Sequence, residues 1–125
     1  MNGWKVFFIV AALFNFAAGV PSLVAPNEAL QIMNLPAAPD VLFHQVTGLL
    51  VVAFGVGYGI VAGDTSRNHA LVWLGAGGKA GVVFLFWQAY AAGAIPFPAF
   101  VVSFGDLAFV AGFVVFLITH RNSAG

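Results

Sequence analysis

The chain has 125 residues, of which 62% are hydrophobic and 6% are charged. Soluble domains are roughly half apolar and a quarter charged, so these proportions exclude an ordinary water-soluble protein and favour a single membrane-embedded domain. The net charge is zero, which excludes the basic face that nucleic acid binding requires. There are no cysteines, so disulfides, thiol chemistry, cysteine-held zinc and iron–sulfur clusters are excluded.

Four long apolar segments follow one another along the chain. A helix needs roughly 20 residues to cross a hydrocarbon core of about 30 Å, and each segment has that length. Without water, the backbone polar groups must be satisfied within each segment, which favours helices over a barrel. We predict an all-α, integral membrane four-helix bundle with helices at about residues 4–24, 41–62, 71–92 and 97–119.

The first segment shares features with a secretory signal. Lys5 precedes its apolar run, and Ala17, Ala18 and Gly19 form a cluster of small residues. However, Asn15 interrupts the apolar run and three further apolar segments follow. We therefore interpret the segment as a retained helix.

The longest connection, residues 25–40, contains a run with helical period from Asn27 to Met33. We predict a short amphipathic helix at about residues 27–34, capped by Asn27, ended before Pro36 and lying at the membrane interface. Two roles remain open for it: a lid over an outward-facing pocket, or a connector on the surface.

The positions of basic residues outside the spans predict the orientation. Lys5, Arg67 and Arg121 all fall on one side of the membrane, whereas the opposite side carries Glu28 and Asp40. Basic residues are enriched in cytoplasmic segments. We therefore expect the N-terminus and the C-terminus to be cytoplasmic.

Two full charges, Lys79 and Asp106, fall deep inside the spans. Each costs roughly 2.5 to 3.5 kcal/mol at a helix centre, so each needs a structural or functional reason. From the helical rise, Lys79 lies about 12 Å from the cytoplasmic end of its helix and Asp106 about 13 Å from the outer end of its own. Both are then near the midplane and can pair, and Asn15 falls at the same level.

The second span contributes a stripe on one helix face. The stripe consists of His44, Thr47, Gly48, Val51, Gly55 and Tyr58. His44 and Thr47 are expected on the outer side of the midplane, and Ser103 lies one turn outward from Asp106. The candidate ligand-binding or relay residues are Asn15, His44, Thr47, Lys79, Ser103 and Asp106.

Five of the six candidates also have a structural interpretation. Lys79 and Asp106 can form an ion pair that only fixes helix register, and Asn15 and Thr47 can bond across helices. His44 can be a hydrogen-bonded histidine rather than a titrating group or metal ligand. His69 and His120 are expected to be solvated at the cytoplasmic edge.

Two pairs of small residues have the spacing typical of close helix packing. They are Gly55 with Gly59 and Gly77 with Gly81. The second pair lies on the side away from Lys79, so it is a candidate contact with another subunit. The sequence contains no residue spacing typical of a metal site, a phosphate-binding loop or a nucleophile elbow, and no catalytic residue is assigned.

The layout resembles small four-helix bacterial membrane proteins of the DoxX-like group. The segments that carry the resemblance are Asn15–Gly19, Gly48–Leu50, Gly55–Tyr58, Gly63–Asn68, Gly75–Lys79 and Gly105–Leu107. The resemblance implies a multi-pass protein of the bacterial inner (plasma) membrane. It also implies either quinone-linked redox chemistry or an accessory role, but no catalytic residue carries over and the cofactor stays unknown.

Three functions remain open. The first is a binding or accessory protein whose polar cluster orients an anionic or carbonyl-bearing group of a small lipophilic ligand, as a homo-oligomer or a subunit of a larger membrane complex. The second is a small oligomeric proton-coupled transporter, in which Lys79 or Asp106 changes protonation between two states. The third is a purely structural assembly subunit.

Overall fold

The computed structural model describes residues 2–120. Within them it contains five helices and no strand: α1 (Gly3–Val24), α2 (Pro26–Ile32), α3 (Val41–Gly63), α4 (His69–Ala91) and α5 (Phe97–Thr119). The four long helices are long and apolar enough to cross a membrane, and they match the predicted segments to within two residues at each end. The all-α prediction is confirmed for the described residues.

Local signals explain where the helices begin and end. Asn2 caps α1, since its side-chain oxygen accepts from the Lys5 amide at 2.6 Å, and Asp40 caps α3. Gly93, with φ +74°, ends the turn after α4 in a conformation that glycine adopts without strain. The short helix confirms the predicted element of the long connection, but Asn27 is not its cap.

The prediction that Asn27 caps α2 is wrong because the helix begins one residue earlier, at Pro26. Proline suits the first turn of a helix, where no backbone donor is needed. The Asn27 side chain instead accepts a hydrogen bond from the Ala38 amide at 3.0 Å. It thereby holds the connection between α2 and α3 against α2.

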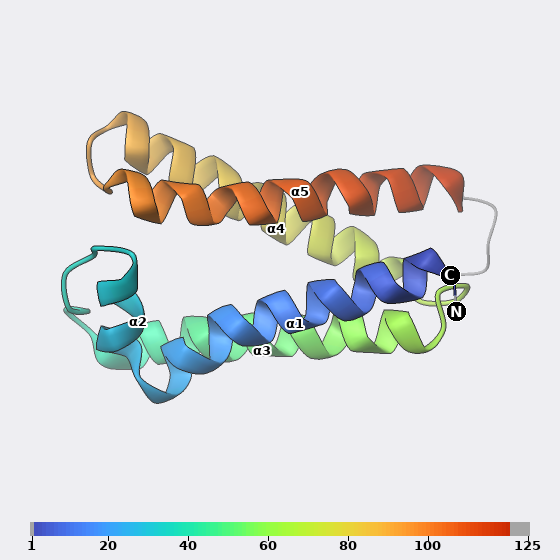
Figure 1. Ribbon diagram of the computed structural model, residues 1–125, viewed down its shortest axis with the longest axis horizontal. Coiled ribbons are helices and arrows are strands. Elements are labelled where there is room, and N and C mark those ends of the chain that lie inside the picture. Colours follow the sequence, from blue (N-terminus) through green and yellow to red (C-terminus); the bar gives the residue numbers. More distant parts are fainter. Residues whose placement is uncertain (1, 121–125) are drawn as a thin grey trace.

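The long helices form two antiparallel pairs, α1 with α3 and α4 with α5 (Figure 1). The pairs meet at the end where α1 begins and α5 ends, which we call the closed end. They separate toward the end that carries α2, which we call the open end (Figure 1).

The buried core lies in the closed half of the molecule. Its residues are Phe8, Ala11, Ala12, Tyr58, Val61, Ala62, Val72, Ala76, Phe113, Phe116 and Leu117. The Phe8 ring of α1 stacks on Phe113 of α5, with 5.5 Å between centroids, and meets Phe116 edge to face. Aromatic packing thus joins the two pairs at the closed end.

Candidate functional site

Lys79 lies where the buried core gives way to the open half, and it joins three helices. Its Nζ is 2.5 Å from Asp106 Oδ1 of α5 and 2.9 Å from Asn15 Oδ1 of α1. The exposed fractions of Asn15 and Lys79 are 4% and 7%. The predicted pairing of Lys79 with Asp106, and the placement of Asn15 at the same level, are confirmed. We call Asn15, Lys79 and Asp106 the polar cluster.

The third long helix contributes a backbone group to the polar cluster. Asn15 Nδ2 donates to the carbonyl oxygen of Val51 at 3.0 Å. A carbonyl has two lone pairs, so Val51 can accept this bond in addition to a bond within its helix. Gly55 allows the approach, since a Cβ there would lie 3.2 Å from the Asn15 Cβ and 2.7 Å from the Phe16 ring. All four long helices therefore meet at this layer.

Three aromatic rings surround the Lys79 ammonium. The distances from Nζ to the ring centroids are 5.0 Å for Phe14, 5.7 Å for Tyr58 and 5.4 Å for Phe109. Cation–π attraction of this kind is stronger where the cation is desolvated, and it helps to offset the cost of burying the charge. The three rings thus stabilise the buried Lys79 ammonium of the polar cluster in addition to Asn15 and Asp106.

Sequence reasoning missed this ring cage. Tyr58 was placed on the helix stripe but not among the candidate site residues, and Phe14 and Phe109 are two of fourteen phenylalanines. Helical spacing could have singled out Phe109, because a residue three positions after Asp106 lies on the same face. The contact of Phe14 depends on how α1 is turned against α5, and no spacing within one helix gives that angle.

A cavity of about 680 Å³ opens beside the polar cluster, and we call it the main cavity. Its volume is within the roughly 300–1,000 Å³ of small-molecule sites. All four long helices and α2 line it. Its lining residues are Phe14, Asn15, Ala17, Ala18, Pro21, Ser22, Ala29, Ile32, Met33, His44, Thr47, Leu50, Val51, Phe54, Tyr58, Gly75, Gly78, Lys79, Val82, Phe86, Val102 and Asp106. The cavity is therefore apolar with one charged pair in its wall.

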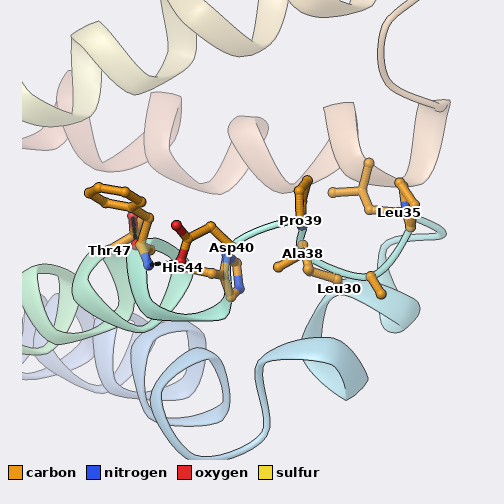
Figure 2. A pocket seen from close by; sticks show the side chains of 10 residues that line it. Leu30, Leu35, Ala38, Pro39, Asp40, His44 and Thr47 are labelled. Carbon is orange, nitrogen blue, oxygen red and sulfur yellow. Dashed lines mark hydrogen bonds between the residues drawn. The ribbon is translucent and has the colours of Figure 1, made fainter.

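A second cavity of about 460 Å³ lies at the open end, under the connection from α2 to α3 (Figure 2). Leu30, Leu35, Pro39 and the first turns of α3 line it. It shares His44 and Thr47 with the main cavity, so the two spaces adjoin. Helix α2 and its connection to α3 therefore border both spaces, as the lid interpretation of that segment requires.

The remaining candidate residues divide between cavity and helix packing. His44 and Thr47 line both cavities, although the Thr47 hydroxyl donates to the Phe43 carbonyl of its own helix at 3.0 Å. His44 Nε2 is buried and has no hydrogen-bond partner within the described residues. Ser103 is fully buried, donates to the Phe100 carbonyl at 2.6 Å and does not line the main cavity. The structure thus separates Ser103 from the other candidates.

The glycine packing predicted from spacing along the second span is confirmed at Gly55. Gly55 packs against α1, but a Cβ at Gly59, Gly77 or Gly81 would meet nothing within 4 Å. Gly59 is exposed, so the close helix packing predicted from its spacing to Gly55 does not occur at Gly59 within residues 2–120. Gly77 and Gly81 lie on an exposed face of α4, and their contact with another subunit stays a prediction.

The close helix crossing occurs elsewhere, at Gly19 of α1 and Gly48 of α3. A Cβ at Gly19 would lie 2.8 Å from the Gly48 carbonyl oxygen, and a Cβ at Gly48 would lie 2.9 Å from the Gly19 carbonyl oxygen. These reciprocal contacts bring two backbones together. The pair was not predicted, because its members are on different helices and no spacing along the chain connects them.

The expectation that His69 is solvated is wrong. His69 is 8% exposed, its ring meets Phe116 edge to face at 5.2 Å, and its Nε2 has no hydrogen-bond partner within the described residues. His120 is partly buried and stacks on Phe116 with 4.4 Å between ring centroids. Both rings are packed because the helix ends converge at the closed end. Arg121, which contributed to the predicted orientation, lies outside the described residues.

No group of three or more potential metal-ligating side chains occurs within residues 2–120. The polar cluster instead offers one cation, one carboxylate and one amide beside an apolar space. The resemblance to the DoxX-like group stays a prediction. Comparisons of the chain with protein-family models, with curated proteins and with solved structures found no match.

Proposed function

We propose that the chain is a small membrane protein that binds a small lipophilic ligand in the main cavity, with the polar end of the ligand at the polar cluster. The observation that carries the proposal is the position of the Lys79–Asp106 pair, which is desolvated and yet lines an apolar cavity of about 680 Å³. An ion pair that only fixed helix register would be expected to be covered on all sides by packed side chains.

The proposal extends to the membrane in which the protein lies, its orientation there and its assembly. Four helices that could cross a membrane support a multi-pass membrane protein, and we place it in the bacterial inner membrane with both termini cytoplasmic. Lys5 and Arg67 support this orientation because both lie near the closed end, by the first turn of α1 and the connection from α3 to α4. We further propose an accessory role as a homo-oligomer or a subunit of a larger membrane complex. The support is the glycine face of α4, formed by Gly77 and Gly81, where an added Cβ would meet nothing within 4 Å among residues 2–120.

Native mass spectrometry of the protein extracted gently from its own membrane tests the binding proposal, with Gly78→Leu as the variant. Gly78 lines the main cavity and a Cβ there meets nothing within 4 Å, so leucine should occupy ligand space without disturbing the fold. Gly77→Leu is the matched control, since Gly77 also has free space but does not line the cavity.

A bound small molecule that is retained in the parent protein and in Gly77→Leu, but is lost in Gly78→Leu, is the expected result. Equal retention by both variants would show that the molecule binds outside the main cavity. The same spectra report the subunit number. A lower subunit number in Gly77→Leu alone would support the glycine face of α4 as the contact between subunits.

A proton-coupled transporter is the second candidate, and the division into two helix pairs favours it. The pairs are packed internally and joined mainly at the closed end, which is the arrangement needed for one pair to rock against the other. Its test is flux into liposomes driven by a pH gradient. Flux that is abolished by replacing Lys79 and Asp106 together would favour transport over binding.

A purely structural role makes the opposite prediction. If the charged pair serves only assembly, Lys79→Met combined with Asp106→Leu should keep the fold and the subunit number while no ligand is found in any variant, because replacing both halves of a buried pair is often close to neutral.

A further inference from the structure

The Lys79 ammonium retains donor capacity toward the main cavity. An ammonium group has three N–H donors, and Lys79 uses two of them on Asn15 Oδ1 and Asp106 Oδ1. Within residues 2–120 no third oxygen or nitrogen accepts from Nζ, and three aromatic rings have their centroids 5.0 to 5.7 Å from it. A ligand oxygen in the cavity can therefore accept one hydrogen bond from Lys79.

The charge of Lys79 is already compensated. The Asp106 carboxylate is 2.5 Å from Nζ, and among the described residues these two are the only Lys, Arg, Asp or Glu side chains that line the main cavity. An anionic ligand at Lys79 would lie beside a carboxylate in a poorly solvated space, where like charges repel strongly and an uncompensated charge is costly. An uncharged hydrogen-bond acceptor avoids both the repulsion and the cost of burying an uncompensated charge.

The rest of the wall is suited to a hydrocarbon tail. The residues that line the cavity away from the polar cluster include Leu50, Phe54, Val82, Phe86 and Val102. They leave space that continues from Lys79 toward α2 at the open end. A ligand with a single polar head and an apolar tail would place its head against the cluster and its tail along this wall.

Resting on the proposed function, we propose that the main cavity selects an uncharged carbonyl amphiphile, such as a fatty ester, over an anion of the same length. The carbonyl oxygen accepts the third ammonium hydrogen bond of Lys79, and Asp106 is the residue that excludes anions. The pairing of Lys79 with Asp106 thus favours a carbonyl-bearing group over an anionic group as the polar end of the ligand.

Binding of methyl palmitate and of hexadecylsulfonate to the full-length protein in lipid nanodiscs tests this selectivity. The sulfonate stays ionised at every accessible pH, so its charge is constant. Native mass spectrometry over a concentration series gives an apparent Kd for each probe. We expect the ester to bind at least about tenfold more tightly than the sulfonate, equivalent to about 1.4 kcal/mol.

Asp106→Asn should invert this preference. The amide keeps the shape of the side chain and an acceptor for Lys79 but removes the compensating charge, so the sulfonate should now bind more tightly than the ester. The double variant Lys79→Gln with Asp106→Asn carries neither charge and should show no inversion. If Asp106→Asn does not fold, the comparison of the two probes on the parent protein still tests the selectivity.

The outcomes separate the two proposals. Binding of neither probe to the parent protein would overturn the proposed function, and this inference with it. Sulfonate binding as tight as ester binding in the parent protein would overturn the inference alone and leave the binding function standing. Ester preference that is unchanged in folded Asp106→Asn would show that Asp106 does not set the selectivity.

Discussion

Asn15 shows how one uncharged side chain supports a buried charge. Its amide oxygen accepts from Lys79 at 2.9 Å while its amide nitrogen donates to the Val51 carbonyl at 3.0 Å, so both ends of the amide are used. The second bond fixes which end of the amide faces Lys79. Asn15 therefore links the charged pair of α4 and α5 to the pairing of α1 with α3.

Replacing Asn15 should therefore cost stability. In Asn15→Leu, the Lys79 ammonium loses an acceptor in a buried site, and we expect the free energy of unfolding to fall by about 1–3 kcal/mol. Thermal unfolding in one detergent measures the change. Gln88→Leu is the control, since Gln88 is also an amide in a long helix but is exposed. Equal losses in both variants would contradict the specific role of Asn15.

The charged pair should behave as a unit. Lys79→Met or Asp106→Leu alone leaves one uncompensated buried charge and should cost about 3–5 kcal/mol, whereas the double variant should be close to the parent protein in stability. The measurement is a double-mutant cycle of unfolding free energies. Additive losses would show that the two side chains do not stabilise each other.

At the scale of helices and their connections, backbone contact and capping decide the arrangement. The crossing of α1 and α3 is close because Gly19 and Gly48 each leave room for the carbonyl of the other helix. The connection from α3 to α4 is held by Asp64, whose carboxylate accepts from the hydroxyl of Ser66 at 2.6 Å and from its amide at 3.0 Å.

Two glycines of α3 provide a matched test of the close crossing. Gly48→Ala would place a Cβ 2.9 Å from a backbone oxygen, so α1 and α3 would have to move apart at a cost of about 1–3 kcal/mol. Gly59→Ala meets free space and should be neutral or stabilising by up to about 1 kcal/mol. Unfolding free energies of both variants check this, and a neutral Gly48→Ala would contradict it.

The connection from α3 to α4 makes a prediction about pH. The hydrogen bonds from the Ser66 hydroxyl and amide, with a smaller contribution from Arg67, hold the pKa of Asp64 below its ordinary value. A lowered pKa means that these bonds stabilise the connection above the ordinary pKa and are lost as pH falls through the folded pKa. Ser66→Ala should raise the pKa of Asp64, and carboxyl NMR titration measures it. An unchanged pKa would show that the hydroxyl is not the main cause.

At the scale of the whole molecule, the buried core and the cavity occupy opposite halves. The core residues gather at the closed end, where Phe8 packs on Phe113 and Phe116, while the helix pairs separate toward α2 (Figure 1). The polar cluster lies between the two halves. A ligand at the cluster would thus contact both helix pairs and limit their relative motion.

This arrangement predicts different mobility at the two ends. The chain has no cysteine, so introduced cysteine pairs can carry spin labels without background. Labels at Phe43 and Phe97, which are exposed at the open end, should give a broad distance distribution that methyl palmitate narrows. Labels at Ile60 and Ile118, exposed near the closed end, should give a narrow distribution that the probe leaves unchanged. The reverse pattern would contradict a ligand between the helix pairs.

The sequence by itself determined the four long helices, the short helix after α1 and the common level of Asn15, Lys79 and Asp106. Hydropathy and the fixed rise of a helix give the length of each segment and the depth of each residue within it. The tertiary structure decided which helices pair, which glycines touch and which rings surround Lys79. Those features depend on how each helix is rotated and tilted against its neighbours. Apolar surface covers almost every helix face in this chain, so hydrophobic pattern does not mark the face that packs, and only the side-chain fit between helices selects it.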